Sequence, residues 1–284
     1  MKALLLYNPL SGRGHRIVKN LDKICAIFRR NAIEIRPKEL SFGDNPFVGE
    51  EATELAVVCG GDGTLNYVIN AMHEAGVCPT LGIIPSGTAN DFAGALGMSR
   101  RLLVAARQIA EGSERKVDCG IANGRYFINV LSFGLLTTTS QHTSDSEKRM
   151  WGKIAYVREG LRDLVRMHGI PLHIKSDNEE FESEVLMLLV FNGRTAGRIT
   201  LARGAAIDDG LLDVLLLKKR NPMANCLDMA RHLVGGGTHA VRHFRTSKLE
   251  ITTQIDEPTD VDGQEGPKFP IELRCKGSAL KFRC

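Results

Sequence analysis

The chain has 284 residues, of which 43% are hydrophobic and 25% are charged, and its formal net charge is +4. This composition is typical of an ordinary globular protein, and the length suits two domains of moderate size. The basic excess is too small to indicate nucleic acid as a partner, although it is compatible with an anionic substrate or an anionic membrane surface.

Strand and helix patterns alternate over the first part of the sequence. The strand patterns are continuous apolar runs, as expected of parallel strands that are buried on both faces. The helix patterns place apolar residues three or four positions apart. The predicted strands are residues 3–7, 54–59 and 80–85, and the predicted helices are about residues 17–28, 65–72 and 99–111. This alternation predicts a doubly wound parallel sheet.

Strand patterns predominate from about Asp118 onward, and turns or short loops separate many of them. We therefore expect an α/β domain at residues 1–118 and a β-rich domain at residues 119–277. The polar stretch 137–149 is the most loop-like part of the chain.

Three predicted strands end in glycine-containing loops, at Asn8–Gly12, Gly60–Thr64 and Ser86–Asp91. Ligands of an open parallel sheet bind outside the carboxyl ends of its strands, where these loops fall together. Glycines let backbone N–H groups approach phosphate oxygens, and a helix N-terminus adds its dipole. An aspartate suits such a place when Mg²⁺ lies between it and the phosphates. The loops predict a magnesium–nucleotide site, although a lone GGDG is as typical of a tight turn.

The residues of these loops are similar to those of a known family. NPLSG, GGDGTLN and PSGTANDFA, at residues 8–12, 60–66 and 85–93, resemble the catalytic domain of the diacylglycerol kinase superfamily. The resemblance is closest to the bacterial soluble lipid kinases, which also resemble sphingosine kinases. It continues in order along essentially the full chain, through DCG at 118–120, FINVLSFG at 127–134, DGLLDV at 209–214 and VDGQ at 261–264.

The resemblance implies both a fold and a reaction. The implied fold is an N-terminal α/β domain like that of NAD kinases and a C-terminal β-sandwich, with the nucleotide in the cleft between them. It also allows the last strand, about residues 278–284, to return to the first domain. The implied reaction uses ATP and Mg²⁺ to phosphorylate the hydroxyl of a lipid such as diacylglycerol. The expected partner is therefore a lipid alcohol at a membrane surface.

The resemblance also assigns site residues. The nucleotide would be held by Asn8, Pro9, Ser11, Gly12, Gly60, Gly61, Asp62, Gly63, Thr64, Gly87, Thr88 and Asn90. The catalytic Mg²⁺ would be held by Asp62 and Asp91, with Asp118 as a further candidate. A second, structural Mg²⁺ would be held by the side chain of Asp209 and the backbone carbonyls of Ala206 and Leu211. The local sequence at residues 208–210, taken by itself, is typical of a plain β-turn.

Two positions within the matched motifs depart from the family pattern. Asp262-Gly263-Gln264 stands where the family has Asp-Gly-Glu, and a glutamine amide cannot act as a general base. If the aspartate is the base, Asp262 carries the reaction; if the glutamate is the base, it is lost here unless Glu265 substitutes. Such a loss would slow phosphoryl transfer, which depends mainly on positioning and electrostatics. Tyr67 stands where many relatives have Glu, and we expect it to be half-buried.

Two other functions stay open on the sequence. NAD kinases share GGDGT, so a soluble substrate such as NAD is one alternative. A nucleotide-binding regulator that has lost catalysis is the other, because of Gln264. PSGTANDFA and DGLLDV belong to the lipid branch and favour the lipid kinase. Diacylglycerol, phosphatidylglycerol, a sphingoid base and another lipid alcohol all remain candidate acceptors.

The sequence indicates a cytoplasmic protein. None of the seven cysteines is spaced as CxxC, so we expect neither a disulfide framework nor a zinc site. The first apolar run is too short for a signal peptide, and no uncharged apolar segment is long enough to span a membrane. Lys148, Arg149, Trp151 and Lys153 suit a peripheral contact with the inner membrane face. The sequence leaves a homodimer open.

Overall fold

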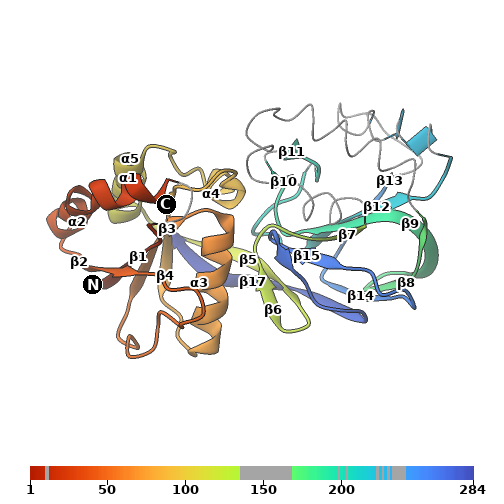
Figure 1. Ribbon diagram of the computed structural model, residues 1–284, viewed down its shortest axis with the longest axis horizontal. Helices are drawn as coiled ribbons and strands as arrows, with labels where there is room; N and C mark the ends of the chain where they lie inside the picture. The colour runs from red at the N-terminus through yellow and green to blue at the C-terminus, as the bar shows by residue number, and fades with distance from the viewer. Residues whose placement is uncertain are drawn as a thin grey trace.

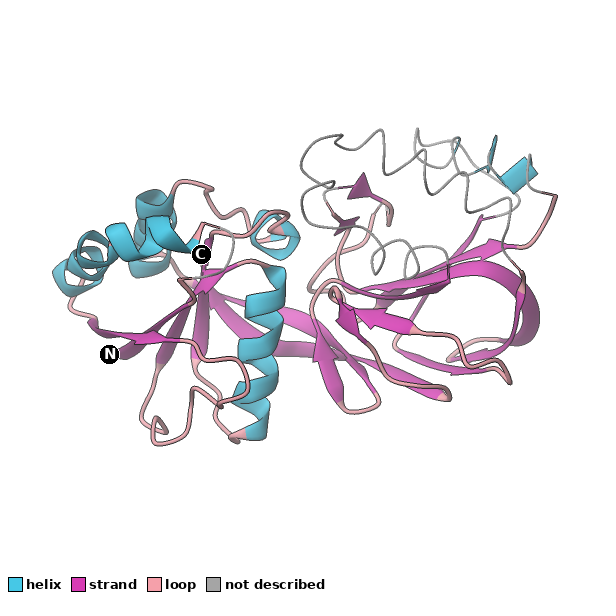
Figure 2. Cartoon of the chain, in the orientation of Figure 1, coloured by secondary structure: helices cyan, strands magenta, loops and turns pink. Residues whose placement is uncertain are grey.

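The computed structural model of the chain describes residues 1–9, 13–134, 168–197, 199–202, 204–221, 224–225, 227–228, 231 and 241–284. The chain forms two lobes that are joined by long strands (Figure 1). The helices α1 to α5 all lie in the first lobe, whereas the described part of the second lobe is built mainly of strands (Figure 2).

The first lobe contains a parallel sheet with the spatial order β4-β3-β1-β2. Every residue of β3 and β4 is buried, which explains why these segments are so apolar in the sequence. The strands are β1 (Lys2–Tyr7), β2 (Glu34–Glu39), β3 (Leu55–Gly60) and β4 (Thr80–Pro85). The predicted parallel sheet is therefore confirmed.

Helices cover both faces of this sheet, with α3 on one face and α2 and α5 on the other (Figure 1). The connections β1–β2 and β3–β4 run in opposite directions along the sheet, so two crossovers of the same hand place their helices on opposite faces. The helices are α1 (Gly14–Lys19), α2 (Leu21–Arg30), α3 (Asp62–Glu74), α4 (Asp91–Ala95) and α5 (Leu102–Glu111). The fold is thus doubly wound, as predicted.

Two details of the first lobe differ from the sequence expectation. The predicted helix over 17–28 is two helices, because the chain breaks at Asn20, whose side chain donates to the carbonyl of Arg16 at 2.8 Å. β2 was not predicted, since it is the edge strand and only Ile35 of its six residues is buried. Pro37 is tolerated there because an edge strand does not need every backbone N–H.

Two long antiparallel strands, β5 (Glu114–Ala122) and β17 (Ile271–Arg283), run from one lobe to the other (Figure 1). The end of β17 also pairs in parallel with β4, through Phe282 and Leu81. The register between β5 and β17 shifts between Lys276 and Leu280, and Ser278 has a φ of 53° there. The two lobes are therefore held together by backbone hydrogen bonds.

The second lobe curls around an apolar core that β5, β7, β8, β9, β12, β14 and β17 share. Apart from the small β10–β11 hairpin, its strands belong to the same mixed sheet as the first lobe. Their bounds are β6 (Arg125–Phe127), β7 (Val130–Gly134), β8 (Ile170–Ser176), β9 (Glu180–Phe191), β10 (Thr195–Ala196), β11 (Ile199–Thr200), β12 (Leu212–Lys218), β13 (Val241–Thr246), β14 (Lys248–Thr252), β15 (Thr259–Val261) and β16 (Gln264–Glu265).

Some sequence expectations concern residues outside this description. The polar stretch 137–149 and the basic cluster at Lys148, Arg149, Trp151 and Lys153 lie outside the described residues. Within the part of the chain that is described, no helix is long and apolar enough to cross a membrane.

Candidate active site

The loops that follow β3 and β4 meet backbone to backbone. A Cβ added to Gly87 would lie 2.5 Å from the Cα of Gly61, and one added to Gly61 would lie 3.0 Å from the Cα of Gly87. Neither position can carry a side chain without moving the other loop. The two glycine motifs therefore form one surface at the carboxyl edge of the sheet.

This surface is open at the N-terminus of α3. A Cβ added to Gly63, in the first turn, would have no atom within 4 Å, so neither packing nor the backbone requires glycine there. The hydroxyl of Ser86 is buried and has no hydrogen-bond partner among the described residues. Backbone N–H groups at a helix N-terminus bind anions. The site can therefore accept phosphate oxygens.

The first loop lies next to this surface. The backbone N–H of Arg13 donates to the carbonyl of Ser86 at 3.0 Å. A Cβ on Gly14 would come within 2.4 Å of the carbonyl oxygens of Asn8 and Pro9, so the chain turns tightly here. The structure thus brings Asn8 and Pro9 to the same edge as the glycine loops. Ser11 and Gly12 lie outside the described residues.

Asp62 connects the second loop to the third. One of its carboxylate oxygens accepts from the N–H of Asp91 and the other from the N–H of Phe92, both at 3.0 Å. The side chain of Asn90, at φ 54°, bonds both the N–H and the carbonyl of Gly87. Asp62, Asn90 and Asp91 are therefore close together, as the sequence predicts.

The two threonines that were predicted to contact the nucleotide differ in their exposure. The side chain of Thr64 packs against Gly60, where a Cβ would come within 2.5 Å of it, and Thr64 is only 7% exposed. Thr88 is exposed on the loop after β4. Of these two threonines, Thr88 is the one that a ligand can reach.

The carboxylate of Asp118 is hydrogen-bonded to backbone groups away from the glycine loops. Its carboxylate accepts from the N–H of Gly210 and from the N–H of Ser278, each at 2.6 Å, and it is 2% exposed. Among the described side chains, no group of three or more His, Cys, Asp or Glu residues is placed to hold a metal ion. The structure therefore does not join Asp118 to Asp62 and Asp91 in a three-carboxylate site. Asp118 instead ties the turn at 208–210 to β17.

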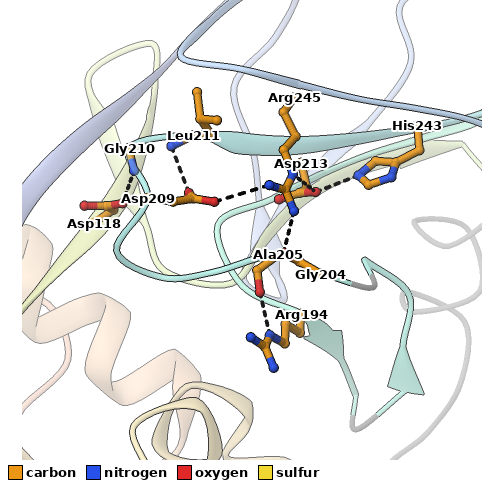
Figure 3. Close-up of polar contacts among 10 residues, drawn as sticks. All are labelled: Asp118, Arg194, Gly204, Ala205, Asp209, Gly210, Leu211, Asp213, His243 and Arg245. Atoms are coloured by element: carbon orange, nitrogen blue, oxygen red, sulfur yellow. Dashed lines mark hydrogen bonds and ion pairs between the residues drawn. The ribbon is translucent and has the colours of Figure 1, made fainter.

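The turn at 208–210 is also anchored to β12 and β13 (Figure 3). Asp209 accepts from the N–H of Leu211 at 3.1 Å, and its other oxygen lies 3.7 Å from a guanidinium nitrogen of Arg245. Arg245 also donates to the buried Asp213 at 3.1 Å and to the carbonyl of Gly204. The guanidinium thus bridges three segments, while Asp209 remains partly exposed.

Asp262 is enclosed by four hydrogen-bond donors. Its carboxylate accepts from the N–H groups of Ile128, Asn129 and Val130 at 2.8–2.9 Å, and from the side-chain amide of Asn66 at 2.8 Å. Asp262 itself has a φ of 52°. This aspartate therefore joins α3, the β6–β7 connection and the β15–β16 hairpin.

The environment of Asp262 raises its pKa to about 6. Burial is the largest cause, and the nearby carboxylate of Asp62 adds to it, whereas the three backbone hydrogen bonds lower the pKa. A pKa near the working pH suits a general base. Asp62 and Asp262 also lie close enough to interact, which brings the hairpin of the second lobe to the glycine loops.

Gln264 points to a different partner. Arg125 donates through one guanidinium nitrogen to the side-chain oxygen of Gln264 and through another to the backbone carbonyl of Glu265. Neither acceptor is charged. The glutamine that replaces the family glutamate is thus held by an arginine and does not share the donors that surround Asp262.

Sequence reasoning missed Arg125 and Asn66. Arg125 lies 139 residues from Gln264 in the chain, so no local pattern reveals their contact. Asn66 carried a signal, because Asn70 follows it at i+4 on the same face of α3. Asn70 and Asn66 both donate to the carbonyl of Tyr126, and Asn70 also accepts from its N–H.

Tyr67 is partly buried against the core, as expected. Its hydroxyl donates to the carbonyl of Asp44 at 2.6 Å and lies 3.2 Å from that of Ser41, while its ring meets Phe42 edge to face. Tyr67 therefore holds the loop after β2 against α3.

Comparisons with known proteins agree with this geometry. Residues 2–122 match the diacylglycerol kinase catalytic domain, and residues 129–284 match the YegS C-terminal NAD kinase beta sandwich-like domain. A diacylglycerol kinase of Bacillus subtilis (strain 168) is 31% identical over 96% of this chain and 92% of its own length. One of Staphylococcus carnosus (strain TM300) is 32% identical over 96% of this chain and 91% of its own length.

Solved structures are similar over nearly the whole chain. A crystal structure from Bacillus anthracis str. Sterne covers 99% of this chain at 26% identity, with a TM-score of 0.82 and 94% of its own length matched. Another from the same organism, described as a diacylglycerol kinase, has a TM-score of 0.75 at 25% identity and covers 99% of this chain and 96% of its own. The predicted α/β domain with a C-terminal β-sandwich is confirmed.

Asp262 makes stability depend on pH in a defined direction. An unfolded aspartate has a pKa of about 3.9, whereas that of Asp262 is raised to about 6 in the fold. A raised pKa gives stabilisation that is complete below about pH 4 and is lost as the pH rises through about 6. Relative to Asp262→Asn, the wild type should therefore lose up to about 3 kcal/mol of unfolding free energy across this window, measured by urea unfolding.

Two features make this measurement specific. The amide nitrogen of Asp262→Asn would face backbone donors, which should cost about 1–3 kcal/mol at every pH and is separate from the slope. Asp44→Asn removes an exposed carboxylate and is the control. A free-energy difference between wild type and Asp262→Asn that stays constant with pH would contradict the raised pKa.

Proposed function

Since the chain belongs to the diacylglycerol kinase catalytic-domain family, we propose that it is an ATP-dependent lipid kinase that phosphorylates a hydroxyl of a diacylglycerol-like lipid. The observation that carries this proposal is the position of Asp262. Its carboxylate, with a pKa of about 6, lies beside Asp62 at the glycine loops. This position supports the proposal, because a group able to accept a proton would lie near the proposed phosphate site.

The glycine loops are proposed to hold the nucleotide. The open space at Gly63 and the backbone contact between Gly61 and Gly87 fit the phosphates. ATP bound there would supply the phosphoryl group, with Mg²⁺ neutralising its charge. Asn8, Pro9, Thr88 and Asn90 would line the same site, as would Ser11 and Gly12 of the first loop.

Asp62 and Asp91 are proposed to face the catalytic Mg²⁺. Each oxygen of Asp62 accepts one backbone hydrogen bond, and a carboxylate oxygen has a second lone pair to offer. Two carboxylates together with substrate phosphates are a usual Mg²⁺ environment. Asp118 is left out of this site because it is buried against Gly210 and Ser278.

In the reaction, Asp262 would accept the proton of the acceptor hydroxyl. With a pKa of about 6 it is mostly ionised at neutral pH, and Asn66 and the amides of residues 128–130 hold it in place. Gln264 has no part in this step. The replacement of the family glutamate by Gln264 therefore does not favour the hypothesis that the protein is a regulator without catalysis. The lipid-branch matches do not favour a soluble substrate such as NAD.

We also propose how the lobes divide and where the protein works. The division lies near residue 118, where β5 passes from one lobe to the other, and residues 278–284 belong with the first lobe. Because the acceptor is a lipid, peripheral contact with the inner membrane face is expected. Phosphate transfer to lipids in anionic vesicles, compared with detergent micelles, tests this contact.

A lipid panel with radiolabelled ATP tests the function. We expect phosphate transfer to a lipid alcohol, offered in detergent micelles or in anionic vesicles, and none to NAD. Asp262→Asn should lower kcat at least 100-fold, in the range of general-base catalysis, whereas Glu265→Gln, a matched change in the same hairpin, should not. Transfer to no lipid despite ATP binding, or a large gain of activity in Gln264→Glu, would contradict the proposal.

Two glycine substitutions separate folding from nucleotide binding. Gly87→Ala forces a Cβ to within 2.5 Å of Gly61 and should destabilise the fold by about 1–3 kcal/mol. Gly63→Ala meets no atom within 4 Å and should be neutral or gain up to about 1 kcal/mol as a helix residue. Both should weaken ATP binding at least tenfold in calorimetry. Gly63→Ala with wild-type ATP affinity would contradict the proposed phosphate position.

A second Mg²⁺ is proposed at the turn 208–210, on the side chain of Asp209 and the carbonyls of Ala206 and Leu211. These are oxygen donors, which Mg²⁺ prefers, although Arg245 shares the carboxylate at 3.7 Å. Adding Mg²⁺ to EDTA-treated protein without nucleotide should raise the Tm. Asp209→Asn should abolish most of this rise, and Asp208→Asn, whose side chain pairs with Arg115, should keep it. An equal rise in Asp209→Asn would remove the site from the proposal.

A further inference from the structure

A cavity of about 670 Å³ lies between α3 and the β5–β6 hairpin. It begins beside Asp262, because Asn66 lines it and donates to that carboxylate, and Gln264 forms part of its wall. A lipid whose hydroxyl points to Asp262 would place the neighbouring atoms of its head group here. Its lining residues are Asn66, Tyr67, Asn70, His73, Glu74, Asn123, Gly124, Arg125, Tyr126 and Gln264.

The amides in this cavity are already engaged. Asn66 donates to Asp262 and to the carbonyl of Tyr126, and Asn70 bonds both backbone groups of Tyr126. These side chains hold the walls together and have little left to offer a ligand. Recognition of a head group therefore depends on the charged groups.

Arg125 carries the positive charge of the wall. A guanidinium has five N–H donors, and the bonds of Arg125 to Gln264 and to the carbonyl of Glu265 use two of its nitrogens. Both acceptors are neutral, and no ion pair of Arg125 occurs among the described residues. The guanidinium also acts on the nearby carboxylate of Asp260, whose pKa burial raises and Arg125 lowers. Its remaining donors are available to a ligand.

Other charged groups also lie around the cavity. Glu74, the acidic residue of the lining, is eight positions after Asn66 on α3, about 12 Å along the axis. Lys276 adds a second cation, with its ammonium 5.5 Å from the centre of the Tyr126 ring. His73 stacks on the same ring, and burial together with Lys276 lowers its pKa, so it is neutral. Arg125 and Lys276 therefore bring two cations to this region, which also holds the carboxylates of Asp260 and Asp262.

We propose that this cavity is the head-group subsite of the acceptor and that the Arg125–Gln264 pair selects an alcohol whose head group also carries a negative charge, such as a phosphodiester. This inference rests on the proposed lipid kinase function and adds the charge class of its substrate. Gln264 is decisive because it orients Arg125 without neutralising it. A carboxylate at position 264 would form an ion pair with the Arg125 guanidinium and neutralise its charge within the protein.

The test compares two short-chain acceptors in micelles of an uncharged detergent, which removes the effect of surface charge. The measured quantity is kcat/KM for dioctanoyl-phosphatidylglycerol divided by that for dioctanoylglycerol. We expect a ratio above one for the wild type. Arg125→Gln and Gln264→Glu should each lower it at least tenfold, and Arg125→Lys should lower it less. Arg107→Gln, on the exposed face of α5, removes one positive charge far from the cavity and should not change it.

The outcomes separate this inference from the function on which it rests. An unchanged ratio in both Arg125→Gln and Gln264→Glu, with circular dichroism showing folded protein, overturns the inference alone. A rise in the KM for ATP with an unchanged ratio also overturns it, because the arginine then serves the nucleotide. Transfer to neither lipid by the wild type overturns the proposed function and this inference with it.

Discussion

The carboxylate of Asp262 is the interaction on which the arrangement of the site depends. Asn66 reaches it from α3 in the first lobe, and the amides of residues 128–130 reach it from the second. Since a buried charge is costly unless it is hydrogen-bonded, the four donors and the carboxylate require one another. The same hydrogen bonds therefore connect the two lobes and fix the position of the Asp262 carboxylate.

The positions of the glycine loops depend on a close contact between their backbones. Gly61 and Gly87 touch through their backbones, so the helix N-terminus of α3 and the loop after β4 present a single surface. Asp62 attaches the start of α4 to this surface by accepting hydrogen bonds from its first two N–H groups. Its charge also contributes to the raised pKa of Asp262. The carboxylates of Asp62 and Asp262 are thus coupled electrostatically, so the charge at the glycine loops influences the protonation of Asp262.

The sequence predicted those parts of the fold that local physics determines. β3 and β4 are apolar because both of their faces are buried, and their glycine loops follow directly. β2 escaped prediction because an edge strand with a single buried residue has no apolar pattern. The surroundings of Asp118 also escaped prediction, since Ser278 reaches Asp118 only when β5 and β17 pair. The partner of Gln264 escaped because Arg125 lies 139 residues away in the chain.

Gln264 illustrates why a motif departure has to be interpreted through its neighbours. By the sequence alone, exchanging a carboxylate for an amide removes a candidate base and suggests a loss of catalysis. In the structure the amide accepts from Arg125, while the donors that stabilise an anion all converge on Asp262. The exchange therefore changes the charge of the cavity wall and leaves the environment of Asp262 intact. If Asp262 is the proton acceptor, as proposed, this exchange can alter which substrate is attracted without altering the group that accepts the proton.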